Sequence, residues 1–98
     1  MNNTEYLSRF NNILAEMSRI TEAKHSDYGD DAVFGMGMKM RFADIYRKYQ
    51  RLKAIMWDMK EAQVKDETLR DTLIDLANYA VIAIIQMDLE NDSKPKDI

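Results

Sequence analysis

The chain of 98 residues has no cysteine, one proline, one histidine and three glycines. The lack of cysteine excludes disulfide scaffolds, thiolate-bound zinc, iron–sulfur clusters and a thiol nucleophile. The single histidine, His25, excludes any site within one chain that needs two imidazoles. Few glycines and one proline leave few points at which a helix would break, so the composition favours long helices.

A strong excess of charge of one sign is also absent. The 14 basic and 17 acidic residues give a formal charge of −3, which argues against a protein that binds long nucleic acid. The first residues lack the basic and apolar segments of a signal peptide. The longest nearly apolar stretch, Leu76 to Met87, contains two amide side chains and is shorter than a bilayer-spanning helix requires. We therefore expect a cytoplasmic protein, of a bacterium or of a virus-infected cell, with no membrane partner.

The spacing of apolar residues predicts an all-α chain. Apolar side chains recur at steps of three and four residues, the period of one helical face, over three separate stretches. The predicted order is a helix over 4–24, an ordered glycine-containing loop over 25–38, a helix over 39–59, a polar connection over 60–65 and a helix over 66–89. The predicted fold is a bundle of three long helices.

The ends of the predicted helices carry capping residues. Asn3 or Thr4 suits the N-cap of the first helix, and Asp66 suits that of the third. These helices are expected to form a single domain over 1–90. The charged residues 91–98, which include the proline, predict a flexible tail.

The third predicted helix is apolar nearly all round between Tyr79 and Met87. A helix of this kind is either central in its own chain or covered by a second subunit. The first helix and the loop are the alternative cover within one chain. We favour a homo-oligomer, which covers the surplus apolar surface with a second copy.

The second predicted helix carries a basic stripe. Arg41, Asp44, Lys48 and Arg51 fall on one side of this helix and border its apolar face. These charges are therefore expected at the edge of the core. Such cations can hold phosphate groups by charge-assisted hydrogen bonds.

The third predicted helix carries an acidic stripe. Glu67, Asp71, Asp75 and Asn78 follow one another at steps of four, four and three residues. Like charges at such steps are destabilising unless cations offset them. The cations could be the basic side chains of the second helix, in a plain network of ion pairs, or Mg²⁺, which favours carboxylates, waters and phosphate oxygens. The sequence leaves both open.

A third group of candidates lies at the end of the first predicted helix. Lys24 and Asp27 precede Tyr28, whose ring could stack on a flat ligand, and Gly29, which permits a sharp turn or a close backbone approach. A helix that simply ends at a glycine is the alternative.

These groups stand in an order that resembles a known family. The order is Lys24-x-x-Asp27-Tyr28-Gly29, then Arg41-x-x-Asp44-x-x-x-Lys48-x-x-Arg51-Leu52, then Glu67-x-x-x-Asp71-Thr72-Leu73-x-Asp75-Leu76-Ala77-Asn78-Tyr79-Ala80. Over residues 20 to 88 it resembles the nucleotide modification associated domain 1 family, small helical proteins of phages and bacteria. The resemblance implies a protein that handles nucleotides or modified bases.

A more distant similarity is to MazG-like all-α nucleoside triphosphate pyrophosphohydrolases. Those enzymes hold Mg²⁺ with acidic pairs on two adjacent helices. Within its basic stripe the second helix here offers only Asp44, flanked by bases, so one of the two acidic pairs is missing. This departure disfavours hydrolysis by two metal ions.

Three functions remain. The first is a nucleotide-binding protein in which Lys24, Arg41, Lys48 and Arg51 hold phosphates. The base of the bound nucleotide would stack on Tyr28 or Tyr79. Asn78 would form a hydrogen bond with the base or the ribose. In a phage, such a protein could sequester a nucleotide immune signal of the host. The second function is a Mg²⁺-dependent triphosphate pyrophosphohydrolase, with Glu67, Asp71 and Asp75 as the candidate metal ligands. In it Asp71 and Asp75 would ligate the metal, and Glu67 or Asp44 would orient the water. The third is a non-catalytic interaction module with internal ion pairs. We favour the first because bases predominate on the second helix.

Overall fold

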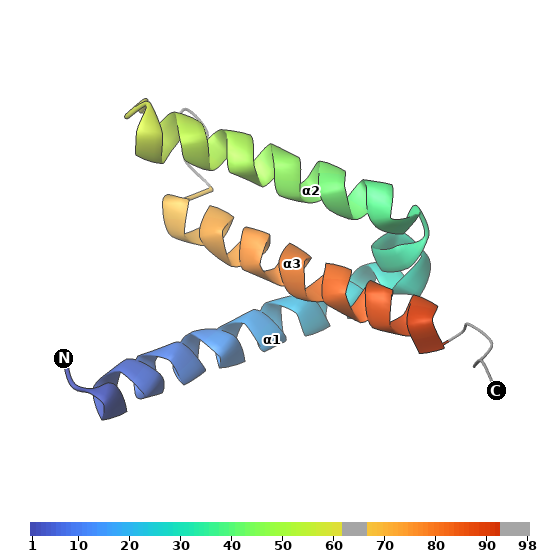
Figure 1. Cartoon of the computed structure of the whole chain (residues 1–98), viewed down its shortest axis with the longest axis horizontal. Helices are drawn as coiled ribbons and strands as arrows, with labels where there is room; N and C mark the ends of the chain where they lie inside the picture. The colour runs from blue at the N-terminus through green and yellow to red at the C-terminus, as the bar shows by residue number, and fades with distance from the viewer. Residues whose placement is uncertain (62–66, 93–98) are drawn as a thin grey trace. The chain divides into compact units, whose positions relative to one another are not determined.

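The computed structural model describes residues 1–61 and 67–92, apart from the side chains of residues 30–33. All regular structure in these residues is helical, which confirms the predicted all-α class. Helix α1 spans Asn3–Phe34, α2 spans Gly37–Leu52 and α3 spans Leu69–Asp92 (Figure 1). The chain divides into two compact units, Met1–Gly35 and Met36–Ile98.

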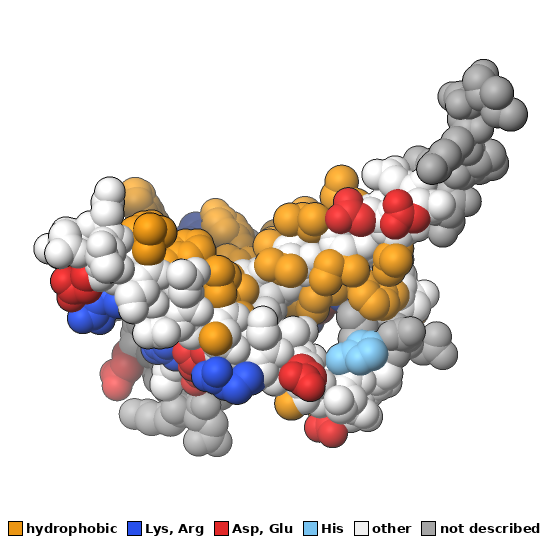
Figure 2. Space-filling model, turned by 90° about the horizontal axis from the view of Figure 1, so that it is seen from below, with side chains coloured by type: hydrophobic (Ala, Val, Ile, Leu, Met, Phe, Trp, Pro, Cys, Tyr) orange, Lys and Arg blue, Asp and Glu red, His pale blue; other side chains and the backbone are white. Residues whose placement is uncertain are grey.

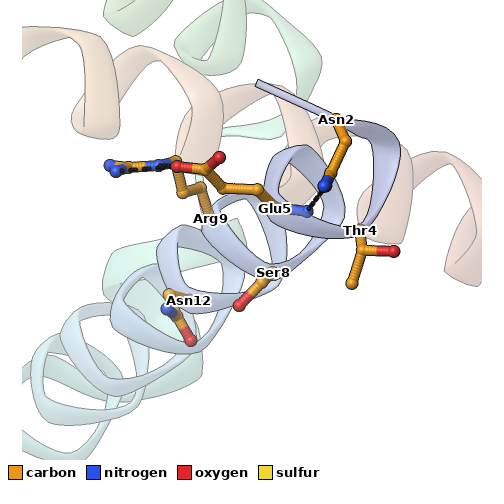
Figure 3. A pocket seen from close by; sticks show the side chains of 6 residues that line it. All are labelled: Asn2, Thr4, Glu5, Ser8, Arg9 and Asn12. Carbon is orange, nitrogen blue, oxygen red and sulfur yellow. Dashed lines mark hydrogen bonds and ion pairs between the residues drawn. The ribbon is translucent and has the colours of Figure 1, made fainter.

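Helix α1 makes up the first unit. The side-chain oxygen of Asn2 accepts a hydrogen bond from the backbone N–H of Glu5 at 2.9 Å, which makes Asn2 the N-cap (Figure 3). The cap therefore lies just before the predicted Asn3 or Thr4. The helix is kinked at Gly29, where φ is 80° and ψ is 178°, and continues to Phe34.

The predicted loop over 25–38 is wrong in its extent. Only Gly35 and Met36 form a turn between α1 and α2, and the residues before them are helical on both sides of the kink. The polar residues around His25 do not stop the helix. The change of direction is confined to Gly29, since glycine adopts a positive φ without a steric penalty.

In the second unit, α2 and the turn after it fill most of the predicted helix 39–59. After Leu52 the chain forms a π-helical turn, η1, over Lys53–Trp57. The backbone N–H of Asp58 donates to the carbonyl of Lys53 at 2.9 Å, and the two side chains form an ion pair at 3.1 Å. The following residue, Met59, has a positive φ of 57°, which ends the helix.

Helix α3 begins with a reciprocal cap. The hydroxyl of Thr68 accepts from the backbone N–H of Asp71 at 3.0 Å, and the N–H of Thr68 donates to the Asp71 carboxylate at 3.2 Å. Hydrogen bonds from Thr68 hold the pKa of Asp71 below its usual value. The predicted cap Asp66, the end of the connection and residues 93–98 of the tail lie outside the described residues.

Helices α2 and α3 pack side by side and run in opposite directions (Figure 1). The buried apolar side chains of this unit, among the described residues, are only Leu52 and Ile74. The buried polar ones outnumber them: Arg41, Asp44, Thr72, Asn78 and Gln86. Arg41 and Asp44 of α2 therefore lie inside the contact, whereas Lys48 and Arg51 are half-buried, as expected at the edge of the core.

Several apolar side chains that the sequence predicted to lie in the core are exposed to solvent. Tyr49 and Met56 of α2 and η1 are half-exposed. On α3 the exposed apolar residues include Leu73, Val81 and Ile84. Figure 2 shows hydrophobic side chains open on the surface of the C-terminal half of this helix. The helix pair alone thus leaves an apolar face of α3 uncovered.

Among the described helices, α3 is long and apolar enough to cross a membrane, judged by length and composition. It has 24 residues, and its apolar window reaches a mean hydropathy of 1.4. The stretch Leu76 to Met87 is part of this longer helix, and the absence of a membrane partner stays a prediction. The core helix of a water-soluble protein meets the same criterion, so the observation assigns no membrane by itself.

Candidate functional site

The charged and hydroxyl side chains between α2 and α3 form a row that we call the polar seam. It comprises Arg41, Asp44, Lys48 and Arg51 of α2, Glu67 just before α3, and Thr72 and Asp75 of α3. The helical period places the α2 members on one stripe, and the antiparallel packing sets them against α3. Three cations face three carboxylates, so the seam as defined is close to neutral.

One end of the seam is a buried ion pair. A guanidinium nitrogen of Arg41 lies 3.2 Å from the Asp44 carboxylate, and only 5% and 10% of these side chains are exposed. Asp44 also binds the mostly exposed Arg47 from the surface side. The Nε atom of Arg41 is buried and has no hydrogen-bond partner among the described residues. This pair therefore has one donor still to be satisfied.

Lys48 lies at the centre of the seam. Its ammonium is 2.7 Å from Glu67 and 3.1 Å from Asp75. Burial disfavours the charged ammonium, but hydrogen bonds to the two carboxylates outweigh this and raise the pKa of Lys48 above 10.5. The hydrogen bond from Lys48 holds the pKa of Glu67 below 4.5. Both groups are therefore charged at neutral pH.

The other end of the seam joins Arg51 to the residues that precede and open α3. Its Nε donates to the Thr72 hydroxyl at 3.1 Å, and a terminal nitrogen donates to the backbone carbonyl of Glu67. The Thr72 hydroxyl lies 3.1 Å from the Glu67 carboxylate and 3.0 Å from the carbonyl of Thr68. Thr72 is fully buried, whereas about a fifth of the Arg51 side chain is exposed. This end is therefore accessible to solvent.

The lowered pKa of Glu67 predicts how the free energy of unfolding depends on pH. Because the pKa of Glu67 is lowered by folding, its contribution is present above pH 4.5 and is lost as the pH falls through the folded-state pKa. The parent should therefore be more stable than Glu67→Gln at pH 7, and this difference should shrink in acid. Urea unfolding of both proteins at pH 7 and pH 3 measures it. A difference independent of pH would contradict the assignment of Glu67 as a charged partner of Lys48.

The predicted metal ligands do not converge. Asp71 is exposed and binds Thr68 in the helix cap, while Glu67 and Asp75 both bind Lys48. No group of three possible metal ligands occurs among the residues whose side chains the structure describes. The described residues therefore do not fit a Mg²⁺ site made by protein carboxylates alone.

The remaining predicted residues fall into two places. Lys24, Asp27 and Tyr28 are exposed on α1 just before the kink at Gly29, in the first unit. Asn78 is buried and Tyr79 is half-buried on α3, one turn beyond Asp75. In an antiparallel pair this turn lies at the level of Asp44, so both residues continue the seam toward its buried end.

Sequence reasoning missed two buried polar residues of α3. Thr72 is a partner of Arg51, and Gln86 is buried with a side-chain oxygen that has no partner among the described residues. Thr72, Tyr79 and Gln86 recur at seven-residue steps, two helical turns apart, so they share a stripe of α3. This seven-residue spacing is the feature of the sequence that could have indicated a common polar face.

A comparison with known protein families identifies a match over the part of the chain that contains the seam. The family model described as nucleotide modification associated domain 1 matches residues 24–87, well over half of the chain. The chain belongs to this family. No curated protein and no solved structure matches it.

The matched range of the nucleotide modification associated domain contains the whole polar seam. A shallow depression at the start of α1 lies outside that range (Figure 3). Its lining is polar and comes from a single exposed helix: Asn2, Thr4, Glu5, Ser8, Arg9 and Asn12. The seam, and not this depression, is therefore the candidate site of the domain.

Proposed function

We propose that this member of the nucleotide modification associated family binds a small nucleotide and holds its phosphates with the cations of the polar seam. One observation carries the proposal: Lys48 and Arg51 of α2 both reach Glu67, an anionic group at the partly exposed end of the seam. Cations that hold a carboxylate in this way can hold a phosphoryl group by the same charge-assisted hydrogen bonds.

The family assignment supports this choice over a purely structural role. Internal ion pairs alone would satisfy the same contacts, and a protein-binding helical module remains the simplest rival. A nucleotide that carries an immune signal is one ligand that a non-catalytic binding protein would sequester. Mg²⁺ would enter such a site with the phosphates, since the described carboxylates are engaged elsewhere.

A panel of mono-, di-, tri- and cyclic nucleotides tests the proposal. Each is added with Mg²⁺ or with EDTA, and the melting temperature is recorded, because a ligand that binds the native state stabilises it. We expect at least one nucleotide to raise the melting temperature of the parent. If no member of the panel does so, the interaction-module alternative is favoured.

Removal of Arg51 should distinguish ligand binding from simple packing. Arg51→Ala is expected to weaken nucleotide binding more than tenfold, because a charge-assisted contact to phosphate is lost. Arg9→Ala is the matched control, since Arg9 pairs with Glu5 on the exposed surface of α1, outside the seam. Circular dichroism first establishes that each variant is folded. Equal binding by a folded Arg51→Ala variant would contradict the proposal.

The pyrophosphohydrolase alternative has its own readout. Asp75→Asn keeps the shape of the side chain and removes the charge that faces Lys48. In a binding protein this change should be milder than Arg51→Ala. Release of pyrophosphate by the parent, and its loss in Asp75→Asn, would instead favour the enzyme.

A further inference from the structure

The oxygen Oε1 of Glu67 is the point on which three side chains of the seam converge: it accepts hydrogen bonds from Lys48 and Thr72 and forms an ion pair with Arg51. It lies 2.7 Å from the ammonium of Lys48, 3.1 Å from the hydroxyl of Thr72 and 3.8 Å from Nε of Arg51. Two cations and one hydroxyl around a single anionic oxygen are the surroundings that a phosphoryl oxygen requires. Three side chains, from both helices, thus build an oxyanion site.

Both the side chain and the backbone of Glu67 contact this site. Its carboxylate meets Lys48 and Thr72, and its backbone carbonyl accepts from Arg51. It nevertheless precedes the first residue of α3, Leu69, so the helical hydrogen-bond ladder does not hold it. About a third of its side chain is exposed, whereas Thr72 is fully buried. The donors are therefore fixed by the helix pair, and the acceptor is the part that can leave.

We propose that Glu67 is an internal stand-in for the ligand: its carboxylate occupies the position of a phosphoryl oxygen and is displaced when a nucleotide binds. This inference rests on the proposed function and adds two points to it. Thr72 becomes a third phosphate donor beside Lys48 and Arg51. Glu67 becomes a competitor that weakens binding, in place of the metal ligand that the sequence indicated.

The charge balance of the seam agrees with such an exchange. With Glu67 in place, three cations face three carboxylates. When Glu67 leaves, the seam as defined gains one net positive charge at the end where Lys48 and Arg51 lie. A phosphate offers more negative charge and more acceptor oxygens than one carboxylate, so it can engage Lys48 and the fork of Arg51 together.

Isothermal titration calorimetry tests the exchange with inorganic pyrophosphate and the four deoxynucleoside triphosphates, each measured separately. Glu67→Gln keeps the shape and removes the charge, and Glu67→Ser removes both. Both variants should bind about three- to tenfold more tightly than the parent, because no internal ion pair has to be broken. The control Glu5→Gln, which loses an exposed ion pair with Arg9, should bind like the parent.

The outcomes separate this inference from the proposed function. If the parent binds a probe and both Glu67 variants bind it equally or more weakly, Glu67 is not a stand-in, while the proposed function stands. If neither the parent nor the variants bind any probe, the proposed function fails and this inference with it. Binding by the Glu67 variants alone would support the inference most directly.

A measurement on the parent covers the case in which the variants do not fold. The carboxyl carbon of Glu67 can be followed by nuclear magnetic resonance through an acid titration. Without ligand the pKa of Glu67 lies below 4.5, because Lys48 holds the charged form. With saturating pyrophosphate it should return toward 4.5, since the carboxylate has left Lys48. A pKa that stays low while pyrophosphate is bound would overturn the inference.

Discussion

Replacement of Asp44 with alanine should lower the free energy of unfolding by about 3–5 kcal/mol, because it leaves the guanidinium of Arg41 buried without its carboxylate. Both side chains of the pair are at least nine-tenths buried, so water cannot replace the lost partner. Arg41 already has one buried nitrogen without a partner among the described residues, which leaves it little means to adapt. Urea unfolding at pH 7 measures the loss.

The same carboxylate provides the control. Arg47 also binds Asp44, but 63% of the Arg47 side chain is exposed. Arg47→Ala should therefore cost no more than about 1 kcal/mol, the usual upper range for an exposed ion pair. Equal losses in Asp44→Ala and Arg47→Ala would show that burial does not govern the strength of these contacts.

Replacement of both partners separates stability from function. A buried ion pair can be exchanged for apolar side chains of similar volume with little loss of stability. We expect Arg41→Met/Asp44→Leu to unfold at nearly the same urea concentration as the parent. If this folded double variant no longer binds nucleotide, the pair serves the ligand. If binding is unchanged, its role is structural.

The helical period was sufficient to predict the all-α class and the charged stripe of α2. It could not predict the ends of the elements, because these depend on individual caps. Asn2 and Thr68 provide the caps, through hydrogen bonds that follow from backbone geometry and not from periodicity. The predicted loop is too long because polar residues alone do not break a helix: the backbone departs from the helix only at Gly29 and at the short turn before α2.

The acidic stripe shows where periodicity misleads. Glu67, Asp71 and Asp75 are spaced by four residues, yet Glu67 precedes the helix and Asp71 turns back to the cap. A common face requires all three to be helical, and they are not. The contacts of Lys48 with Glu67 and Asp75 also depend on the register of α2 against α3. A single sequence contains no information on that register, so the opposing charges could be anticipated but their partners could not.

The uncovered face of α3 bears on assembly. Its exposed apolar residues include Leu73, Val81, Ile84 and Met87, with Ile84 57% exposed. The polar seam holds another side of the same helix against α2, so the apolar face is not needed for that contact. We propose that a second copy of the chain covers it, as the sequence already suggested, because a helix that is apolar on its outer side is rarely left in water.

Light scattering at micromolar concentration should accordingly give a mass at or above twice 11.5 kDa for the parent. Ile84→Glu places a charge in the middle of the open face and should shift the mass to that of one chain, with the helix content unchanged by circular dichroism. Ser8→Glu adds the same charge at an exposed polar position of α1 and should leave the assembly intact. A parent that scatters as a monomer would contradict the proposal.

Because α3 is also long enough to cross a bilayer, flotation with lipid vesicles is the necessary companion experiment. A parent that floats with the vesicles, and an Ile84→Glu variant that does not, would assign this face to lipid instead of to a second copy.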